Sequence, residues 1–570
     1  MNIWKENFST NDLVSDLVAS SRTCELCNMF YLGFQRSKRH FGVEVRYFRR
    51  KSSLLLERNG APVLSLTTIP GSKPAPSAAV RIGFPRLPPP QSSSQFELCR
   101  QWMKDCNSNH KCRPIASFHL PTRVIDVHMD YPYIRLITDT HSLSSDYIVL
   151  SHRWGNVGNM PFLSTFHKNI QEFEQGIEVS ELPRTFQDAI IVTRELGISY
   201  LWIDSLCIVQ DDEKDWHDES QKMEHIYSSA YCTIAATCAT SATDGFLKSR
   251  SERAYVTMRV NRLNEPFYVT EAIDDFRGDV EESALNQRGW VMQERALSNR
   301  TLYFAETQLY WECGEGVRCE TLTKIKNRKA AFIGDPRFPS SALSYYKGGR
   351  IQFFQYLYEK YSTLAFSFNS DRPIAIRGLE RRLLKAFETT GGYGVFRNYL
   401  GRSLLWQRRD SYLCRIDFPC HRMIPSWSWM AYKGSIRYMD IPFGAVEWST
   451  DVDMIGVNDS AYYEEALDGT SSSYLQLFAI VRPVQGATES NGSFLIFDQS
   501  RASRLEDLPL LSCIVVGKQK SESKQKDQMH FVLLVYPKWA GYDTYERIGV
   551  GLLFGEYIGW SSSTERICIQ

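Results

Sequence analysis

A glutamate within the apolar face of a predicted helix is the residue best suited to acid–base chemistry. The sequence predicts a helix over about 211–228, opened by acidic residues that favour a helix N-terminus. Its apolar face contains Trp216 and Met223, and Glu219 falls on the same face at about 100° per residue. Burial raises the pKa of a carboxyl group and costs free energy unless another group binds it. Glu219 is therefore either a carboxylate that acts on a ligand in a cleft, or a structural carboxylate bonded to arginine or backbone donors.

Polar residues also follow two apolar runs that predict buried strands. Ser151 and Arg153 lie at the end of the run at 147–151, and Asp204 ends the run at 200–204. If these strands are parallel, the side chains converge with Glu219 at one sheet edge, where open α/β sheets bind ligands. Arg153 there could bind a diphosphate with two guanidinium nitrogens. Its alternative role is an ion pair with Asp204 or Glu219 that fixes the loops.

Two further residues near these strands have both a chemical and a structural interpretation. Trp154 precedes the turn residue Gly155 and offers a stacking face, but a buried core tryptophan explains it equally well. Cys207 has His217 and His225 nearby in sequence, as a nucleophilic thiol would need, yet it stands in an apolar run where a thiol stays protonated. The sequence contains no motif for ATP hydrolysis, zinc proteolysis or esterase chemistry.

Cysteine and histidine residues in the first 112 positions offer soft ligands for zinc. The candidates are Cys24, Cys27, Cys106, His110 and Cys112. A proline-rich segment separates the first two from the other three, and the spacing is not that of a standard zinc finger. The sequence therefore names zinc candidates without fixing a site, and no cofactor is required by it.

The composition is that of an ordinary globular protein. The 570 residues are 43% hydrophobic and 23% charged, with a formal net charge of +1, which gives no global attraction for nucleic acid or anionic membranes. No apolar stretch reaches the roughly 18 residues that span a bilayer, and the first residues lack the apolar region of a secretory signal. We expect reduced cysteines in a cytoplasmic protein, with a nuclear location also open, and neither a nucleic-acid partner nor a membrane span.

Changes in pattern along the chain divide it into six predicted segments. They are an N-terminal cysteine-containing segment at 1–68, a Pro/Ser-rich linker at 69–95, a lead-in segment at 96–145, an α/β domain at 146–296, a mostly helical region at 297–410 and a β-rich region at 411–570.

Strands and helices alternate within the predicted α/β domain, which favours a mainly parallel sheet. Its expected strands are 147–151, 200–204 continued by 206–209, and 231–236, with helices at 183–196, 211–228 and 288–295. A hairpin is expected at 301–304 and 308–311, and alternating apolar runs after residue 475 predict an antiparallel β module.

Five motifs of the central domain resemble the fungal heterokaryon-incompatibility (HET) domain. They are Tyr147-Ile-Val-Leu-Ser-His-Arg-Trp-Gly155, Leu182-Pro-Arg-Thr-Phe-Gln-Asp-Ala-Ile190, Tyr200-Leu-Trp-Ile-Asp-Ser-Leu-Cys-Ile-Val-Gln-Asp-Asp212, the helix from Asp215 to Ala230, and Arg288-Gly-Trp-Val-Met-Gln-Glu294. Outside the domain, four further motifs also resemble HET-domain proteins: Leu120-Pro-Thr-Arg123, Gln308-Leu-Tyr-Trp-Glu-Cys313, Pro425-Ser-Trp-Ser-Trp429 and Tyr545-Glu-Arg-Ile-Gly549. His152 departs from the family, which often has an aromatic residue there.

The resemblance implies a fungal protein of nonself recognition whose activation arrests growth or kills fused cells, with other incompatibility proteins or itself as partners. The family is distantly similar to TIR domains, which have a flavodoxin-like sheet and in some branches cleave NAD. By that analogy NAD is a candidate substrate, Glu219 the candidate catalytic residue, and Ser151, Arg153, Trp154 and Asp204 the candidate pocket. Glu294 is the reserve, because its spacing from Trp290 is that around the TIR catalytic glutamate. The flanking Arg288 and Arg295 favour a salt-bridged structural role for it instead. The alternatives are a non-catalytic oligomerisation module and an accessory protein of a biosynthetic cluster.

Overall fold

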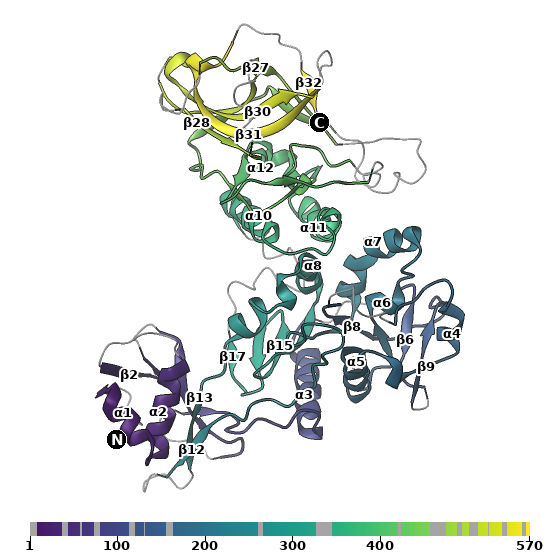
Figure 1. Cartoon of the computed structure of the whole chain (residues 1–570), viewed down its shortest axis with the longest axis vertical. Coiled ribbons are helices and arrows are strands. Elements are labelled where there is room, and N and C mark those ends of the chain that lie inside the picture. The colour runs from purple at the N-terminus through teal and green to yellow at the C-terminus, as the bar shows by residue number, and fades with distance from the viewer. Residues whose placement is uncertain are drawn as a thin grey trace. The chain divides into compact units, whose positions relative to one another are not determined.

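The structure is a computed structural model of the whole chain (Figure 1). It describes residues 8–36, 44–56, 60–72, 80–112, 120–129, 132–155, 163–259, 266–325, 345–419, 423–455, 475–486, 493–500, 511–522, 524–538, 544–560 and 566–570. Residues 73–79 of the predicted linker lie outside this part of the chain. The chain divides into two units: Met1–Gln287 with Leu297–Pro336, and Arg288–Ala296 with Arg337–Gln570. Within the described residues, no helix is both long and apolar enough to cross a membrane.

The first unit contains a seven-stranded sheet near the N-terminus, in the order β1-β2-β3-β4-β13-β12, with β5 beside β4. Its strands are β1 (Ser9–Leu13), β2 (Glu44–Arg50), β3 (Ser53–Leu55), β4 (Pro62–Thr68), β5 (Arg81–Ile82), β12 (Tyr255–Met258) and β13 (Phe267–Glu271). Helices α1 (Val14–Ser21) and α2 (Glu25–Arg36) share a core with it through Leu17, Met29 and Leu64. Strands far apart in the sequence therefore build this sheet, which sequence analysis did not predict.

A ten-stranded sheet forms the rest of the first unit, in the order β17-β16-β15-β14-β11-β8-β10-β6-β7-β9. Its strands are β6 (Val124–Asp126), β7 (Tyr133–Ile137), β8 (Tyr147–Ser151), β9 (Ile177–Glu178), β10 (Tyr200–Trp202), β11 (Cys232–Ala235), β14 (Arg300–Phe304), β15 (Leu309–Cys313), β16 (Gly316–Cys319) and β17 (Lys324–Ile325). Its helices are α3 (Ser93–Asn109), α4 (Ile170–Gln175), α5 (Arg184–Glu195), α6 (Asp204–Cys207) and α7 (Glu213–Ser229).

This sheet is mixed, whereas a mainly parallel sheet was predicted. Strand β8 runs parallel to β10 and β11, and β11 runs parallel to β14. The outer strands are antiparallel, because short connections such as the one between β14 and β15 can join only antiparallel neighbours. The prediction thus holds for the four central strands, and a flavodoxin- or TIR-like core is not confirmed.

Most local predictions in this region are confirmed. Strand β8 has the predicted bounds, and all five of its residues are buried. Helix α5 follows Pro183 as predicted, and Gly197 after its end has φ +74°, a conformation that glycine adopts easily. The predicted strand at 206–209 is wrong. Asp204 accepts a hydrogen bond from the Ser205 amide and the chain makes the helical turn α6, which a short apolar run does not distinguish from a strand.

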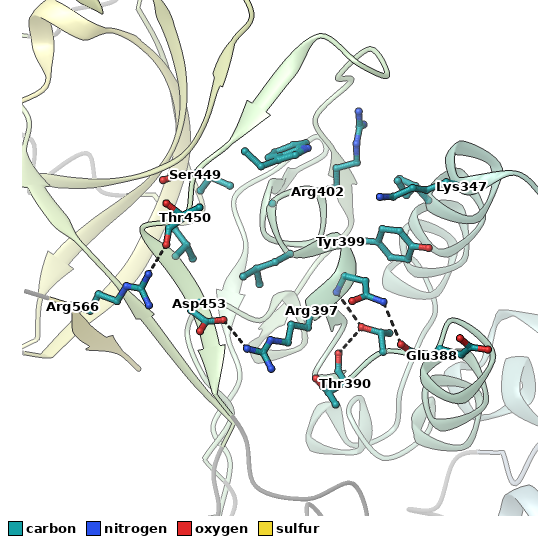
Figure 2. Close-up of a pocket in the computed structure, with 18 residues that line it drawn as sticks. Lys347, Glu388, Thr390, Arg397, Tyr399, Arg402, Ser449, Thr450, Asp453 and Arg566 are labelled. Atoms are coloured by element: carbon teal, nitrogen blue, oxygen red, sulfur yellow. Dashed lines mark hydrogen bonds and ion pairs between the residues drawn. The ribbon is translucent and has the colours of Figure 1, made fainter.

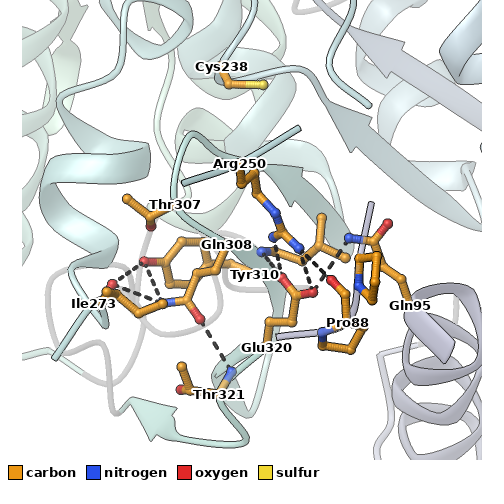
Figure 3. A network of polar contacts seen from close by, with 12 residues as sticks. Pro88, Gln95, Cys238, Arg250, Ile273, Thr307, Gln308, Tyr310, Glu320 and Thr321 are labelled. Atoms are coloured by element: carbon orange, nitrogen blue, oxygen red, sulfur yellow. Dashed lines mark hydrogen bonds and ion pairs between the residues drawn. The ribbon is translucent and has the colours of Figure 1, made fainter. Parts of the chain in front are cut away.

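The Pro-rich segment before α3 is held by a buried ion pair. The Glu320 carboxylate is 0% exposed and binds the Arg250 guanidinium, whose Nη2 lies 2.9 Å from Oε1 (Figure 3). The same Nη2 donates to the Pro88 carbonyl at 3.1 Å, and Gln95 Nε2 donates to Glu320 Oε1 at 3.5 Å. Arg250 therefore connects the chain that enters α3 to the turn after β16.

The second unit combines helices with a nine-stranded sheet in the order β24-β29-β30-β31-β32-β26-β25, where β27 pairs with β29 and β28 with β31. Its helices are α8 (Gly289–Leu297), α10 (Lys347–Ser362), α11 (Arg377–Ala386) and α12 (Leu400–Leu404). The strands are β24 (Val446–Trp448), β25 (Val452–Ile455), β26 (Gln476–Ala479), β27 (Val481–Pro483), β28 (Phe494–Phe497), β29 (Ser512–Gln519), β30 (Met529–Pro537), β31 (Thr544–Phe554) and β32 (Ile567–Ile569). The predicted β module is confirmed, with one parallel pair, β31 and β32.

A buried ion pair lies at the centre of the second unit. The side chains of Arg547 and Asp498 are 0% and 1% exposed, and Arg547 Nε lies 2.9 Å from Asp498 Oδ2. Arg547 Nη1 donates to the Leu404 carbonyl at 2.7 Å, and its guanidinium stacks on the Trp406 ring. The Ser426 hydroxyl accepts the Arg547 amide, so the motifs at 425–429 and 545–549 meet here.

We predict that Arg547→Met lowers the free energy of opening of this sheet by about 3–5 kcal/mol, because it leaves the Asp498 carboxylate buried without its cation. Hydrogen exchange of the β30 amides in the full chain measures this free energy. Arg409→Met is the matched control, since Arg409 and Asp410 form an exposed pair at 3.6 Å that contributes little. Equal exchange in both variants would contradict the prediction.

Candidate functional site

The carboxyl ends of the central parallel strands form the edge on which the predicted site residues were expected. From β8 the chain passes to β10 on one side and then to β11 on the other, so the direction of strand order reverses at β8. Ligands of open α/β sheets bind at such a reversal. Strand β6 is antiparallel to β10, which brings Thr122 and Arg123, just before β6, to the same edge.

Asp204 is a fixed and partly exposed carboxylate at this edge. Its Oδ2 accepts a hydrogen bond from Trp154 Nε1 at 2.9 Å, and its Oδ1 accepts the Ser205 amide at 2.8 Å. His152 Nδ1 lies 3.9 Å from Oδ1, and the Asp204 side chain is 29% exposed. The structure thus brings Trp154 and Asp204 together, and the indole N–H of Trp154 serves to hold the carboxylate in place.

The two other predicted pocket residues also follow β8. Ser151 is 3% exposed at the end of the strand, and Arg153 is half-buried just beyond it. Among the residues that the structure describes, Arg153 forms no ion pair with Asp204 or Glu219, the alternative that sequence analysis left open.

Glu219 is buried, and the described residues bond one of its two carboxylate oxygens. The residue is 1% exposed, and its Oε1 accepts a hydrogen bond from Lys222 Nζ at 2.9 Å. The other oxygen, Oε2, is buried and has no hydrogen-bond partner among the described residues. Lys222 Nζ also donates to Thr122 Oγ1 at 2.9 Å, while the Lys222 side chain is 48% exposed. A partly exposed lysine thus binds one oxygen of Glu219, while the other has no donor in the described part of the chain.

A second ion pair lies next to Glu219. Arg123 binds Asp215 with both guanidinium arms, at 2.7 and 3.0 Å, and donates to the Cys207 carbonyl at 3.1 Å. Burial works to lower the pKa of Arg123, but the hydrogen bond and charge of Asp215, together with the charge of Glu219, raise it overall. Cys207 is fully buried, and this burial raises the pKa of its thiol, which argues against the nucleophile.

Helix α5 holds the loop that follows β11. Thr185 Oγ1 donates to the Ser241 carbonyl at 3.2 Å, and Asp188 Oδ2 accepts the amides of Phe246 and Leu247 at 2.7 and 2.9 Å. Gly155 has φ +89°, and a Cβ at this position would lie 2.8 Å from the Ser241 Cβ. The loops after β8 and β11 therefore touch at the edge.

Comparison with known proteins gives a family for this region. Residues 147–294 match the family model described as "Heterokaryon incompatibility protein (HET)". This segment is a HET domain. It begins at β8, and its motifs fall on the strand ends and helices described above. The domain suggests a function of the heterokaryon-incompatibility type. No curated protein and no solved structure matches the chain.

The last motif of the HET domain lies in the second unit. Helix α8 is held there because the Gly378 amide donates to Gln293 Oε1 at 2.8 Å and Trp290 Nε1 donates to Asp371 Oδ2 at 3.2 Å. Glu294 on this helix is 7% exposed. The reserve candidate therefore belongs to a different unit from Glu219, and its catalytic role stays a prediction.

The zinc candidates separate into two groups. Cys106, His110 and Cys112 come together with Cys313, which was not among the predicted zinc candidates. The other two candidates, Cys24 and Cys27, are not members of this group. They lie at the start of α2, where the Cys27 amide donates to the Cys24 sulfur at 3.5 Å.

The second unit contains a cavity of about 790 Å³ beside α12 and β25 (Figure 2). Four cations and two carboxylates line it: Lys347, Arg397, Arg402, Arg566, Glu388 and Asp453. Within it Arg397 pairs with Asp453 at 3.3 Å and Arg566 donates to the Thr450 carbonyl. The excess of cations favours an anionic ligand. None of these residues stood out in the sequence.

Asp244 organises the loop between β11 and β12. It accepts hydrogen bonds from the Thr240 hydroxyl and amide and from Ser241, which lower the pKa of Asp244 to about 2. Because this pKa lies below the unfolded value, the stabilisation is present above about pH 4 and disappears as pH falls through about 2.

We expect Asp244→Ala to reduce hydrogen-exchange protection of the Ser241 amide at neutral pH by about 1.5–3 kcal/mol. The difference from the unmodified chain should shrink as pH falls from about 4 to about 2. Unchanged protection at neutral pH, or a loss that stays constant with pH, would contradict this role of Asp244.

Proposed function

We propose that this chain acts in nonself recognition between fused fungal cells, and that its HET domain executes growth arrest or death by cleaving NAD. The match of residues 147–294 to the HET family supports the cellular role. The enzymatic part rests on one observation, the buried Glu219 carboxylate whose Oε2 has no donor among the described residues. Such an oxygen costs free energy in the resting protein and accepts a ligand hydroxyl well.

The proposed reaction is hydrolysis of the bond between nicotinamide and ribose. The C1′–N bond breaks, nicotinamide leaves as the neutral base, a water oxygen bonds to C1′, and one proton is released. Positive charge develops on the ribose as the bond breaks, and a carboxylate close to C1′ stabilises it. Glu219 Oε2 would accept a ribose hydroxyl, and Arg153 would bind the diphosphate.

Access to Glu219 requires the Lys222 side chain to move. Lys222 is a long, partly exposed side chain, so it can leave Glu219 and Thr122 without disturbing the core. Asp204 differs from Glu219 because both of its oxygens are already fixed by Trp154 and the Ser205 amide. Asp204 therefore serves to position the loops in this proposal, and Glu219 is the catalytic residue.

A second candidate function, a non-catalytic interaction module, is favoured by the ion pair between Glu219 and Lys222. A carboxylate that is 1% exposed and paired at 2.9 Å also suits a structural role. In that case the HET domain would signal by self-association or by recruiting another incompatibility protein.

We predict that the purified full chain releases nicotinamide from NAD and that Glu219→Gln lowers the rate by about 10²–10⁴-fold. Asp218→Asn is the matched control, because it removes a carboxylate from the adjacent position of α7 and should leave the rate unchanged. Lys222→Met should keep or raise the rate, since it removes the cation that binds Glu219 Oε1. Activity that survives in Glu219→Gln, or an oligomeric sample without any release, would favour the non-catalytic module.

Expression in a fungal host separates the cellular role from the chemistry. We expect the full chain to arrest growth and Glu219→Gln, at equal protein level, to lose this effect. Growth arrest that persists in Glu219→Gln would retain the incompatibility function and exclude NAD cleavage as its cause. Colony growth with Asp218→Asn serves as the reference.

A further inference from the structure

Three cysteines and a histidine from distant parts of the first unit converge at one point. Cys106 and His110 lie at the end of α3, Cys112 follows two residues later, and Cys313 ends β15. Their ligand atoms all lie within 4.8 Å of one another. The three cysteines are buried and His110 is half-buried, so the group is closed to solvent on most sides.

The distances fit a tetrahedral zinc ion. With Zn–S of about 2.3 Å and Zn–N of about 2.0 Å, tetrahedral ligands place sulfur and nitrogen roughly 3.5 Å apart. Cys313 Sγ and His110 Nδ1 are 3.5 Å apart. All three cysteines are free thiols, so no disulfide accounts for their approach.

Arg300 provides an independent observation beside this group. It is 1% exposed, and none of its three guanidinium nitrogens has a hydrogen-bond partner among the described residues. Arg300 pairs with Cys313 across β14 and β15, so the two side chains lie on the same face of the sheet. Its guanidinium lies 5.1 Å from the centre of the Tyr231 ring, and its charge acts on the Cys106 thiol. A buried cation without a counter-ion is costly.

We propose that Cys106, His110, Cys112 and Cys313 bind a structural Zn²⁺ and that Arg300 is the counter-charge of the site. Zn²⁺ bound by three thiolates and one neutral histidine carries a net charge of −1, which the guanidinium neutralises. Three protons leave the thiols when the ion binds. Four protein ligands leave no open position, which is typical of structural rather than catalytic zinc.

The site would fasten α3 to the edge of the ten-stranded sheet. Three ligands come from a short segment around the end of α3, and the fourth comes from β15, which α3 contacts. Closing a chain loop of this length by a metal ion removes much conformational entropy from the unfolded chain. The zinc is therefore expected to stabilise the unit that carries most of the HET domain, independently of any NAD chemistry.

Metal analysis of the full chain, purified without chelator, tests the proposal. We expect about one zinc ion per chain, and a loss of at least about tenfold in occupancy in Cys313→Ser and in the milder His110→Ala. Cys99→Ser is the matched control, because Cys99 is equally buried on α3 but outside the group. Chain without zinc, full occupancy in Cys313→Ser, or a disulfide between two of the three cysteines by mass spectrometry would overturn the site.

Cobalt and Arg300→Met complete the test. Replacing zinc by Co²⁺ in the unmodified chain should give the thiolate charge-transfer and intense visible bands of tetrahedral cobalt, a readout that needs no variant to fold. Arg300→Met should weaken zinc binding about 10–100-fold in competition with a chelator, as loss of a supporting group around a metal typically does. Cobalt spectra without thiolate bands would exclude the ligand set, and unchanged affinity in Arg300→Met would exclude the counter-charge.

Discussion

The loops at the carboxyl edge of the central strands depend on carboxylates that accept backbone amides. A chain that leaves a buried strand must satisfy its N–H and C=O groups without the sheet ladder. Asp204, Asp188 and Asp215 do this after β10, β11 and α6, where they accept the amides of Ser205, Phe246 and Val209. The aspartates of the HET motifs therefore have a structural role, because they hold the loops at the carboxyl edge of the sheet in place.

Glu219 differs from these aspartates, because it accepts no backbone amide among the described residues. Asp215, one turn earlier on α7, is bonded on both oxygens by Arg123 and the Val209 amide. Glu219 has a single donor, Lys222, and a buried oxygen with none among the described residues. Asp215 and Glu219 thus differ in how many hydrogen bonds their carboxylates accept from the described residues. Glu219, which accepts fewer, is the better acceptor for a ligand hydroxyl.

The sequence predicted what depends on local pattern. The strand at 147–151 and the helix bounded by Pro183 and Gly197 both appear in the structure. Their apolar pattern and the residues that begin and end a helix are both visible within a short stretch of sequence. The hairpin of β14 and β15 was predicted, but the mixed sheet was missed, because a local pattern does not identify pairs of distant strands such as β6 and β10. Cys313 was missed as a metal ligand for the same reason, because the contact of β15 with the distant helix α3 brings it to Cys106.

Three arginines, of which Arg300 and Arg547 are buried, differ in the negative charge beside their guanidinium groups. Arg250 binds Glu320, and Arg547 binds Asp498, each with further hydrogen bonds to main-chain carbonyls. Arg300 is as deeply buried as Arg547, yet the described residues supply neither a carboxylate nor a carbonyl to its guanidinium. A buried guanidinium is costly unless a negative charge lies close to it. Three thiolates around a divalent ion provide one net negative charge beside it, so the cysteine group and the unpaired cation explain each other.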